Sequence, residues 1–461
     1  MTDLSRTEAV RAAVADGFPE ALSDLAALVA IPSIAFDAFP REAVETSARA
    51  VAERFEATGL FDQVSIRTAV IPATGETGMP AVLATRAAKP GCPTVLLYAH
   101  HDVQPVGDPA QWDTPPFALT ERDGRLYGRG SSDDKAGVVT HLAALRAASR
   151  TLGDDFGAGV AVFIEGEEET GSRSFAQFLA DNREALTADV IVVADSGNWD
   201  AQTPGLTVSL RGNVRFTLKL RTLAHASHSG MFGGAVPDAM MATVTLLSTL
   251  WDADGAVAVA GLTSREADTP DYTEDDLRRE AGLLPGVSPV GHGTILSRLW
   301  NQPSITITGI DAPSVANASN TISPEASVVI SARVAPGQSA REAYQALAAH
   351  LRAHAPFGAE LSFSDIDYGD AFLADTSGWA ADLAKHALTE AFGRAPVEIG
   401  QGGSIPFVAD LARTFPQAQL LITAVEDPLS RPHTPNESQH INTLSSAILA
   451  EALVLAGLAT S

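Results

Sequence analysis

Residues 94–105, "TVLLYAHHDVQP", contain an apolar run that ends in two histidines and an aspartate. An uninterrupted apolar run of this length is typical of a strand that is buried on both faces of a sheet. Helix-like stretches such as "AGVVTHLAALRAASR" (136–150) separate it from three similar runs, which are "GVAVFI" (159–164), "DVIVVA" (189–194) and "QLLITA" (419–424). The pattern predicts an α/β fold whose central sheet is covered by helices.

Between about residues 207 and 368 the apolar residues alternate strictly with polar ones. The clearest examples are "NVRFTLKL" (213–220), "SITITGI" (304–310) and "SVVISARV" (327–334). A period of two indicates half-exposed, antiparallel strands, so we expect a second domain inserted into the first. Residues 236–251 are expected to form a helix with Pro237 near its first turn, and residues 252–290 a long irregular loop.

Composition restricts the class of protein. The chain has 461 residues, with 31 basic and 56 acidic side chains, and its formal charge of −25 argues against a nucleic-acid partner. We expect no membrane span, because no apolar stretch approaches the roughly 18 residues needed. Cys92 is the single cysteine, and the start "MTDLSRTEAV" lacks the pattern of a secretory signal, so we expect a cytoplasmic protein.

Polar residues follow each buried run at the point where the predicted strand ends. They are His100, His101 and Asp102, then Glu167, Glu168 and Glu169, then Asp195, and finally His433; Asp133 and Asp134 lie in a glycine-rich turn before a helix. Because ligands bind at the carboxyl ends of strands in open α/β sheets, these side chains are expected to converge. Imidazoles and carboxylates without thiols suit zinc, manganese or cobalt. The alternative for "GEEETGS" is a solvated acidic loop that opens a helix.

The spacing of His100 and Asp102 indicates a metal ligand with an orienting partner. Residues i and i+2 of an extended segment lie on one side. A metal-bound imidazole usually donates its second N–H to a carboxylate that fixes its orientation. We therefore expect His100 to be the ligand, Asp102 its partner, and His101 a packed or surface histidine that points away.

Five motifs occur in an order that resembles the M20 metallopeptidases and, within them, the cytosolic dipeptidases of the carnosinase type. They are "YAHHDVQP" (98–105), "YGRGSSDDKAG" (127–137), "IEGEEETGS" (164–172), "SHSGMFGG" (227–234) and "GGSIP" (402–406). The resemblance implies a catalytic domain with a zinc-peptidase-like mixed sheet flanked by helices. It also implies a smaller inserted α+β lid domain that mediates homodimer formation. The expected ranges are 1–208 and 371–461 for the catalytic domain and 209–370 for the lid.

The resemblance also implies a centre of two divalent ions, zinc first, with manganese or cobalt as alternatives. By this resemblance His100 and Asp195 hold one ion, Glu169 and His433 hold the other, Asp133 bridges both, and Glu168 is the general base. Sequence alone does not rank Glu167, Glu168 and Glu169. A water shared by the two ions would become a hydroxide near neutral pH, and Glu168 would carry its proton to the departing amine. The peptide bond between Asp133 and Asp134 is expected to be cis.

Further residues are assigned by the same resemblance. His228 is expected to stabilise the oxyanion in the active site of the partner subunit, and Arg333 to bind the substrate carboxylate as a bidentate fork. The alternatives are a surface histidine in a turn and a charged residue on the wet face of a strand. Asn320 and Ser404 match further substrate contacts, and Gly402 and Gly403 would offer backbone N–H groups.

The resulting hypothesis is metal-dependent hydrolysis of dipeptides or short peptides with a free C-terminal carboxylate. The nearest alternative is an N-acyl amino acid deacylase or desuccinylase with the same metal centre. A catalytically silent relative that binds peptide or metal, and a dimeric structural scaffold, are the alternatives from other classes. The segment "ITAVEDPLSRPHTPNE" (422–437) matches the family loosely apart from "PHTPNE", so the sequence leaves the side chains of the substrate open.

Overall fold

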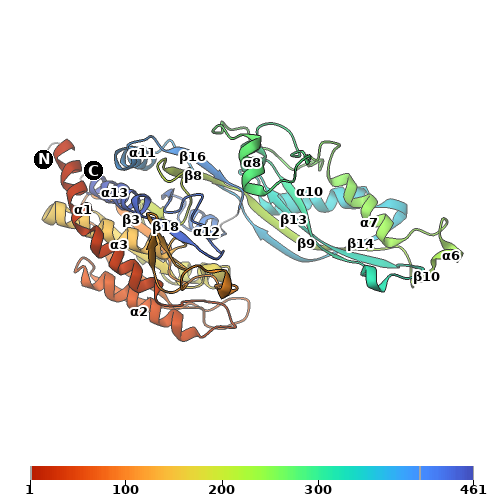
Figure 1. The fold of residues 1–461 in the computed structure, drawn as a ribbon, viewed down its shortest axis with the longest axis horizontal. Helices are drawn as coiled ribbons and strands as arrows, with labels where there is room; N and C mark the ends of the chain where they lie inside the picture. Colours follow the sequence, from red (N-terminus) through yellow and green to blue (C-terminus); the bar gives the residue numbers. More distant parts are fainter. Residues whose placement is uncertain (1–2, 404–405, 460–461) are drawn as a thin grey trace. The chain divides into compact units, whose positions relative to one another are not determined.

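The computed structural model describes residues 3–403 and 406–459, which form two compact units (Figure 1). The first unit comprises Met1–Val208, Ala374–Ile399 and Asp410–Ser461, and the second comprises Ser209–Leu373 and Gly400–Ala409. The second unit is therefore an insertion within the first. The segment Gly400–Ala409, which we expected in the catalytic domain, groups with the inserted unit.

A mixed nine-stranded sheet includes the central strands of the first unit. In spatial order its strands are β1 (Gln63–Arg67), β2 (Ala81–Arg86), β6 (Gly159–Glu165), β3 (Thr94–His100), β7 (Val190–Val193), β17 (Gln419–Thr423), β8 (Gly205–Leu210) and β15 (Phe372–Leu373), and β16 (Val397–Gln401) pairs with β8. The four predicted apolar runs are β6, β3, β7 and β17, which are neighbours and parallel. The predicted mixed sheet is confirmed, and these four strands end at one edge.

Several helices belong wholly or partly to the first unit. They are α1 (Asp3–Val29), α2 (Arg41–Ala57), α3 (Lys135–Leu152), α4 (Phe175–Asp181), α5 (Arg183–Leu186), α11 (Trp379–Phe392), α12 (Pro406–Thr414) and α13 (Ile441–Leu458). Helices α1, α2 and α3 lie side by side (Figure 1), while α3 contacts β3 and α11 contacts β17. Apolar residues such as Leu25, Val139 and Leu455 are fully buried among them. The helix expected at 136–150 is α3.

Helix α13 corrects the expectation that no apolar stretch approaches the length of a membrane span. Among the described residues it alone is long and apolar enough by length and composition, with a mean hydropathy of 1.6. However, 72% of this segment is buried inside the protein, and α13 contacts α1, α3 and α11. Its apolar side chains therefore belong to the core of the first unit.

A small antiparallel sheet joins distant segments of the first unit. Its strands are β18 (Ser438–His440), β5 (Arg125–Tyr127) and β4 (Thr120–Arg122). Ser438 pairs with Tyr127, so the residues just before β18 run close to those just after β5. This pairing brings the segments that carry His433 and Asp133 together.

A four-stranded antiparallel sheet forms the second unit. Its strands, in spatial order, are β11 (Ser304–Asp311), β13 (Glu325–Val334), β9 (Gly212–Arg221) and β14 (Glu360–Gly369). Burial alternates along β9 and β13, as the period of two predicted, and the buried residues include Phe216 and its pairing partner Ile330. Helices α7 (Ala239–Leu247) and α10 (Ala340–Ala353) contact this sheet and complete the core.

The remaining elements of the second unit differ from the helix expected at 236–251 and from the loop expected at 252–290. They are β10 (Ser227–His228), α6 (Ser229–Phe232), α7 (Ala239–Leu247), α8 (Glu274–Ala281), α9 (Ile295–Trp300), β12 (Thr321–Ile322) and α10 (Ala340–Ala353). The side chain of Asp238 caps α7, so Pro237 precedes the helix. Helix α8 lies inside the predicted loop, where Thr273 and Asp276 form a capping box that the sequence analysis overlooked.

Candidate metal centre

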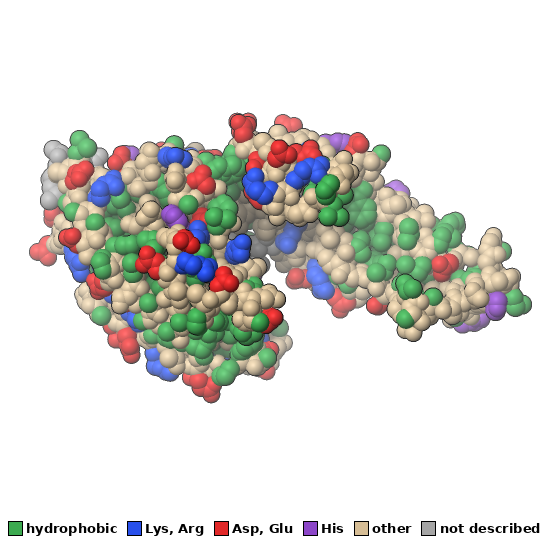
Figure 2. All heavy atoms as spheres, in the orientation of Figure 1, with side chains coloured by type: hydrophobic (Ala, Val, Ile, Leu, Met, Phe, Trp, Pro, Cys, Tyr) green, Lys and Arg blue, Asp and Glu red, His purple; other side chains and the backbone are tan. Residues whose placement is uncertain are grey.

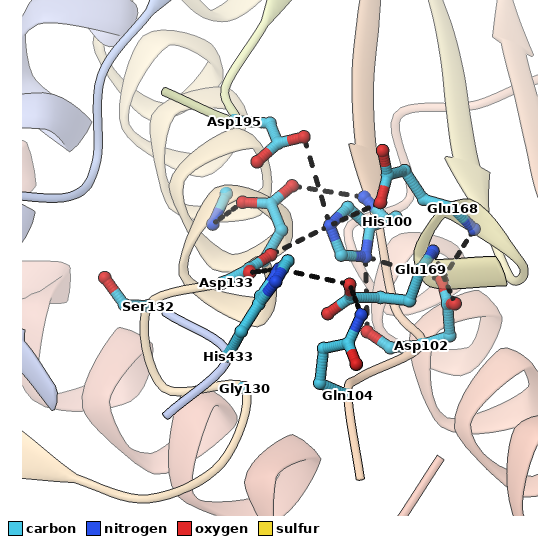
Figure 3. Close-up of polar contacts among 12 residues, drawn as sticks. His100, Asp102, Gln104, Gly130, Ser132, Asp133, Glu168, Glu169, Asp195 and His433 are labelled. Atoms are coloured by element: carbon cyan, nitrogen blue, oxygen red, sulfur yellow. Dashed lines mark hydrogen bonds and ion pairs between the residues drawn. The ribbon is translucent and has the colours of Figure 1, made fainter. Parts of the chain in front are cut away.

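The predicted ligands converge at one edge of the mixed sheet (Figure 3). His100 is the last residue of β3, and Asp195 lies two residues after the neighbouring strand β7. Glu169 follows the end of β6 on the other side of β3. Asp133 is in the turn before α3, and His433 is in the loop before β18. Parallel strands thus bring residues from distant positions to one place.

The ligand atoms form two groups that share Asp133. In the first group, Nε2 of His100 lies 3.1 Å from Oδ1 of Asp133 and 3.9 Å from Oδ2 of Asp195. In the second group, Nε2 of His433 lies 3.0 Å from Oδ2 of Asp133 and 3.2 Å from Oε2 of Glu169. Within each group the ligand atoms lie within 4.8 Å of one another. Asp133 therefore presents one oxygen to each group.

These separations fit divalent ions. Zinc binds imidazole nitrogen and carboxylate oxygen at about 2.0–2.2 Å, and two such ligands in tetrahedral geometry lie about 3.4 Å apart. Most of the observed separations are close to this value. The donors are nitrogen and oxygen only, a set that suits zinc, manganese or cobalt. The residues present could hold one ion in each group.

Three carboxylates of the site, those of Glu168, Glu169 and Asp195, lie in an environment that opposes their ionisation without a cation. Burial raises the pKa of Glu168 and Glu169, and the charges of neighbouring carboxylates raise it further, although the histidines of the site act in the opposite direction. Burial raises the pKa of Asp195 to about 7, and the charges of Asp133 and Glu169 add to this effect. Negative charges held this close favour the binding of positive ions.

The histidines respond to the same negative potential. Hydrogen bonds with Asp133 and Glu169 raise the pKa of His433 to about 11. Burial lowers the pKa of His100, but its hydrogen bonds with Asp102 and Asp133 outweigh burial and raise it. Burial raises the pKa of Asp133, yet the hydrogen bonds from His100 and His433 lower it overall. Each histidine thus occupies a position that favours positive charge.

Asp102 and His101 point in different directions. Oδ1 of Asp102 lies 3.4 Å from Nδ1 of His100. The ring of His101 is fully buried, and its Nε2 lies 2.9 Å from the carbonyl oxygen of Pro80. Burial lowers the pKa of His101 to about 4, so this imidazole is neutral near pH 7. His101 is a packed histidine, as one of the two readings predicted.

The three consecutive glutamates have separate contacts, which the sequence alone did not distinguish. Glu167 accepts hydrogen bonds from the backbone N–H groups of Met79 and Ser174, at 2.9 and 2.6 Å, so it anchors its loop. Oε2 of Glu168 lies 4.0 Å from Nε2 of His100. Glu169 belongs to the second ligand group.

Sequence reasoning missed Gln104, and it named Asp134 only beside Asp133 without giving it a role. Nε2 of Gln104 donates a hydrogen bond of 2.7 Å to Oε2 of Glu169, as Figure 3 shows. Asp134 accepts hydrogen bonds from the backbone N–H of His100 at 3.1 Å and of Gly137 at 3.2 Å. The peptide bond between Asp133 and Asp134 is cis, as expected. The available signal was the position of Gln104 inside the motif "YAHHDVQP", two residues after Asp102.

The second unit carries the other predicted residues. Nδ1 of His228 accepts a hydrogen bond from the backbone N–H of Gly230 at 3.0 Å. The carbonyl oxygen of Asn320 accepts one from the N–H of Ser229 at 2.9 Å, so His228 and Asn320 are neighbours. Gly403 is exposed, and Ser404 lies outside the described residues.

Arg333 is on the less buried face of β13, and a second arginine lies nearby. Arg211 is buried and donates from Nε to the carbonyl oxygen of Gly402 at 3.1 Å. Burial lowers the pKa of Arg211 to about 10, and the positive charge of Arg333 contributes to this. Arg211 was missed, although a charged residue at the end of the apolar strand β8 was a visible signal.

A third group of possible ligands is exposed in the second unit and consists of Asp252, Asp254 and His292. Nε2 of His292 lies 2.9 Å from Oδ2 of Asp252. Oδ1 of Asp252 accepts the backbone N–H groups of Asp254 and Ala256, so this side chain closes a turn. We assign no function to the group.

The fold is that of a metallopeptidase, and the described residues include two groups of possible metal ligands that share Asp133. The chain belongs to peptidase family M20/M25/M40, whose model matches residues 96–457. A cysteinylglycine-S-conjugate dipeptidase of Corynebacterium striatum is 36% identical over 365 residues, which cover 78% of this chain and 80% of the relative. The human Beta-Ala-His dipeptidase is 30% identical over 383 residues, covering 78% and 73%. A solved structure of a dipeptidase from Saccharomyces cerevisiae has the same fold, with a TM-score of 0.77, 22% identity and 99% coverage of both chains.

Proposed function

We propose that this hydrolase is a dipeptidase that cleaves dipeptides or short peptides with a free C-terminal carboxylate, using two divalent ions and Glu168 as general base. The observation that carries the proposal is the position of Asp133, whose two oxygens each face a separate ligand group. Both relatives are named as dipeptidases, and this supports a peptide as the substrate. Zinc is the first choice of ion, with manganese or cobalt as alternatives.

The roles of the side chains follow from their positions. When bound, the two ions would lower the pKa of a shared water and polarise the scissile carbonyl. The carboxylate of Glu168 is partly exposed and lies at the first ligand group, where it would take a proton and pass it to the departing amine. Asp102 would hold the imidazole of His100 in one orientation.

Residues of the second unit would bind the substrate. Arg333 would hold the C-terminal carboxylate through two parallel hydrogen bonds, and the nearby charge of Arg211 would add to the attraction. Asn320, Gly403 and Ser404 would provide further contacts.

We also propose a homodimer formed through the second unit, in which His228 stabilises the oxyanion of the partner subunit. Exposed apolar side chains gather over α6 and α7 (Figure 2). Met231 is 74% exposed and Val244 is 59% exposed. Apolar residues that are this open are typical of a surface that a partner covers, and they support a second copy of the chain as that partner.

A substrate panel tests the reaction. Dipeptides, tripeptides and N-acyl amino acids would be incubated with chelated enzyme and with enzyme restored by zinc, manganese or cobalt. We expect hydrolysis of dipeptides by the restored enzyme and none by the chelated enzyme. Preference for N-acyl amino acids would replace the dipeptidase proposal by the deacylase, and activity that survives chelation would contradict the metal mechanism.

Complementation between two inactive variants tests the role of His228 in the partner subunit. Glu168→Gln and His228→Ala would each be purified, then mixed under conditions that exchange subunits. Half of randomly exchanged dimers are mixed and each contains one complete site, so about a quarter of the wild-type activity should return. Unmixed variants serve as controls. A mixture that stays inactive although subunits exchange would contradict the shared site.

A further inference from the structure

A buried carboxylate outside both ligand groups holds the turn that presents Asp133. The side chain of Glu437 is fully buried. Its Oε1 accepts the backbone N–H groups of Ser132 and Asp133, at 3.0 and 3.1 Å. Its Oε2 accepts the N–H of Gly130 at 3.1 Å and Nη1 of Arg129 at 2.6 Å. Four donors from five consecutive residues thus surround one carboxylate, and Figure 3 shows this turn beside the candidate ligands.

Arg129 extends the contact to two other segments. Its guanidinium is buried, and Nη2 donates to the carbonyl oxygen of Pro105 at 3.3 Å and of Thr434 at 3.4 Å. The same guanidinium lies over the ring of Trp112, 5.4 Å from its centre. The pair of Arg129 and Glu437 therefore joins three segments, each of which contains one candidate ligand: residues 100–105, 129–134 and 433–437.

This arrangement restricts the freedom of Asp133. A carboxylate that bridges two ions must direct one oxygen to each, which requires a fixed backbone as well as a fixed side chain. Glu437 fixes the backbone N–H of Asp133. It also lies four residues after His433, so the same side chain restricts the spacing between Asp133 and His433. Both residues belong to the second ligand group.

We propose that Glu437, held by Arg129, is a positioning residue for the metal centre, because it places Asp133 between the two ligand groups. This inference depends on the two-ion function proposed above. Because Asp133 is shared, loss of Glu437 should weaken the binding of both ions. Loss of a partner that orients metal ligands typically costs about 10- to 100-fold in metal affinity or activity.

A purely structural role for the pair makes a different prediction. Removing one partner of any buried ion pair destabilises the fold, because the other charge loses its compensation. Glu451 offers a matched control in the same unit, because its buried carboxylate lies 2.8 Å from Nδ1 of buried His141 between α13 and α3. Glu451→Gln removes a charge of the same kind and touches no candidate ligand.

The experiment compares Glu437→Gln with Glu451→Gln by zinc titration of the chelated proteins, with thermal unfolding and steady-state kinetics alongside. In Glu437→Gln an NH₂ group replaces one oxygen and faces backbone N–H donors. We expect zinc affinity to fall about 10- to 100-fold and kcat at saturating zinc to fall, with the KM for a dipeptide nearly unchanged. Glu451→Gln should lose thermal stability but keep the zinc affinity and kcat of the wild type.

Arg129→Lys tests the same positioning role if Glu437→Gln does not fold. The lysine retains a positive charge for Glu437 but cannot reproduce the donors to Pro105 and Thr434, so we expect a smaller loss of zinc affinity in the same direction. A folded variant of either residue that binds two ions with the affinity of the wild type overturns the positioning role alone. Wild-type enzyme that binds fewer than two ions overturns the two-ion function and this inference with it.

Discussion

Oδ1 of Asp102 accepts a hydrogen bond of 3.1 Å from the backbone N–H of Glu168. Oδ2 of the same side chain accepts the N–H of Glu169, also at 3.1 Å. Asp102 is fully buried and also faces Nδ1 of His100. One carboxylate thus orients a candidate ligand and fixes the loop that carries the candidate base.

We expect Asp102→Asn to lower zinc affinity and kcat by about 10- to 100-fold, because the amide offers one acceptor oxygen where the loop supplies two donors. Zinc titration and steady-state kinetics measure both effects. Asp108→Asn is a suitable control, since Asp108 is exposed and only caps a short 3₁₀ helix, η1 (Pro109–Gln111). If Asp102→Asn kept the zinc affinity and kcat of the wild type, the loop that carries Glu168 and Glu169 would not need Asp102 as an anchor.

Glu168→Gln should keep its zinc but lose turnover by about 100- to 10,000-fold, because the amide cannot accept a proton. Zinc content and kcat would be measured on the same preparation. Glu167→Gln provides the comparison within the same loop. It should lower thermal stability instead, because Glu167 accepts two backbone N–H groups and lies outside both ligand groups. Substantial kcat in Glu168→Gln would refute its role as base.

Substitution of Gln104 by leucine should weaken zinc binding about tenfold, because Glu169 loses the donor that orients it. In the zinc-free protein Gln104→Glu should lower thermal stability more than Gln104→Leu does, since a further carboxylate would face Glu169 in an already acidic site. Zinc titration measures the affinity of both variants, and thermal unfolding of the zinc-free variants measures the difference in stability. Equal affinities in the wild type and Gln104→Leu would mean that Glu169 keeps its orientation without this contact.

Once the metal has been removed, the stability of the protein to unfolding should fall as pH rises. In the metal-free chain the pKa of Glu168, Glu169 and Asp195 is raised. A carboxyl group with a raised pKa in the folded state gives its full stability below its ordinary pKa of about 4. That stability is lost as pH rises through the folded-state value, which is about 7 for Asp195. Thermal unfolding of chelated and zinc-restored enzyme from about pH 4 to 8 should show a widening gap, and a constant gap would contradict the prediction.

The pair of His141 and Glu451 should stabilise the fold in a pH-dependent way. Burial lowers the pKa of His141, but the charge and hydrogen bond of Glu451 raise it overall. The stability from this shift is complete below the ordinary value of about 6.5 and disappears as pH rises through the folded-state pKa. The difference in unfolding free energy between the wild type and His141→Gln should therefore shrink above about pH 6.5 in urea titrations. His386→Gln, at an exposed position, is the control.

The sequence determined the sheet and the convergence of the candidate ligands. Strands β3, β6, β7 and β17 could be predicted because a strand buried on both faces must be apolar throughout. Parallel neighbours then place the residues that follow them at one edge. His100 and Asp195 were found for this reason. The spacing of His100 and Asp102 indicated that His100 is a ligand, whereas the role of Asp195 and the ranking of Glu168 and Glu169 came from the resemblance to the family.

Tertiary structure decided the contacts that fix those side chains in place. Glu167 proved to be a loop anchor. Gln104 and Arg211 were missed, and Asp134 received no role, because each acts through a partner that local pattern does not identify. Glu437 lies 307 positions from Gly130, yet its carboxylate accepts that backbone N–H. Periodicity and spacing describe neighbours along the chain, whereas a hydrogen bond between distant residues exists only once the sheet and helices have packed.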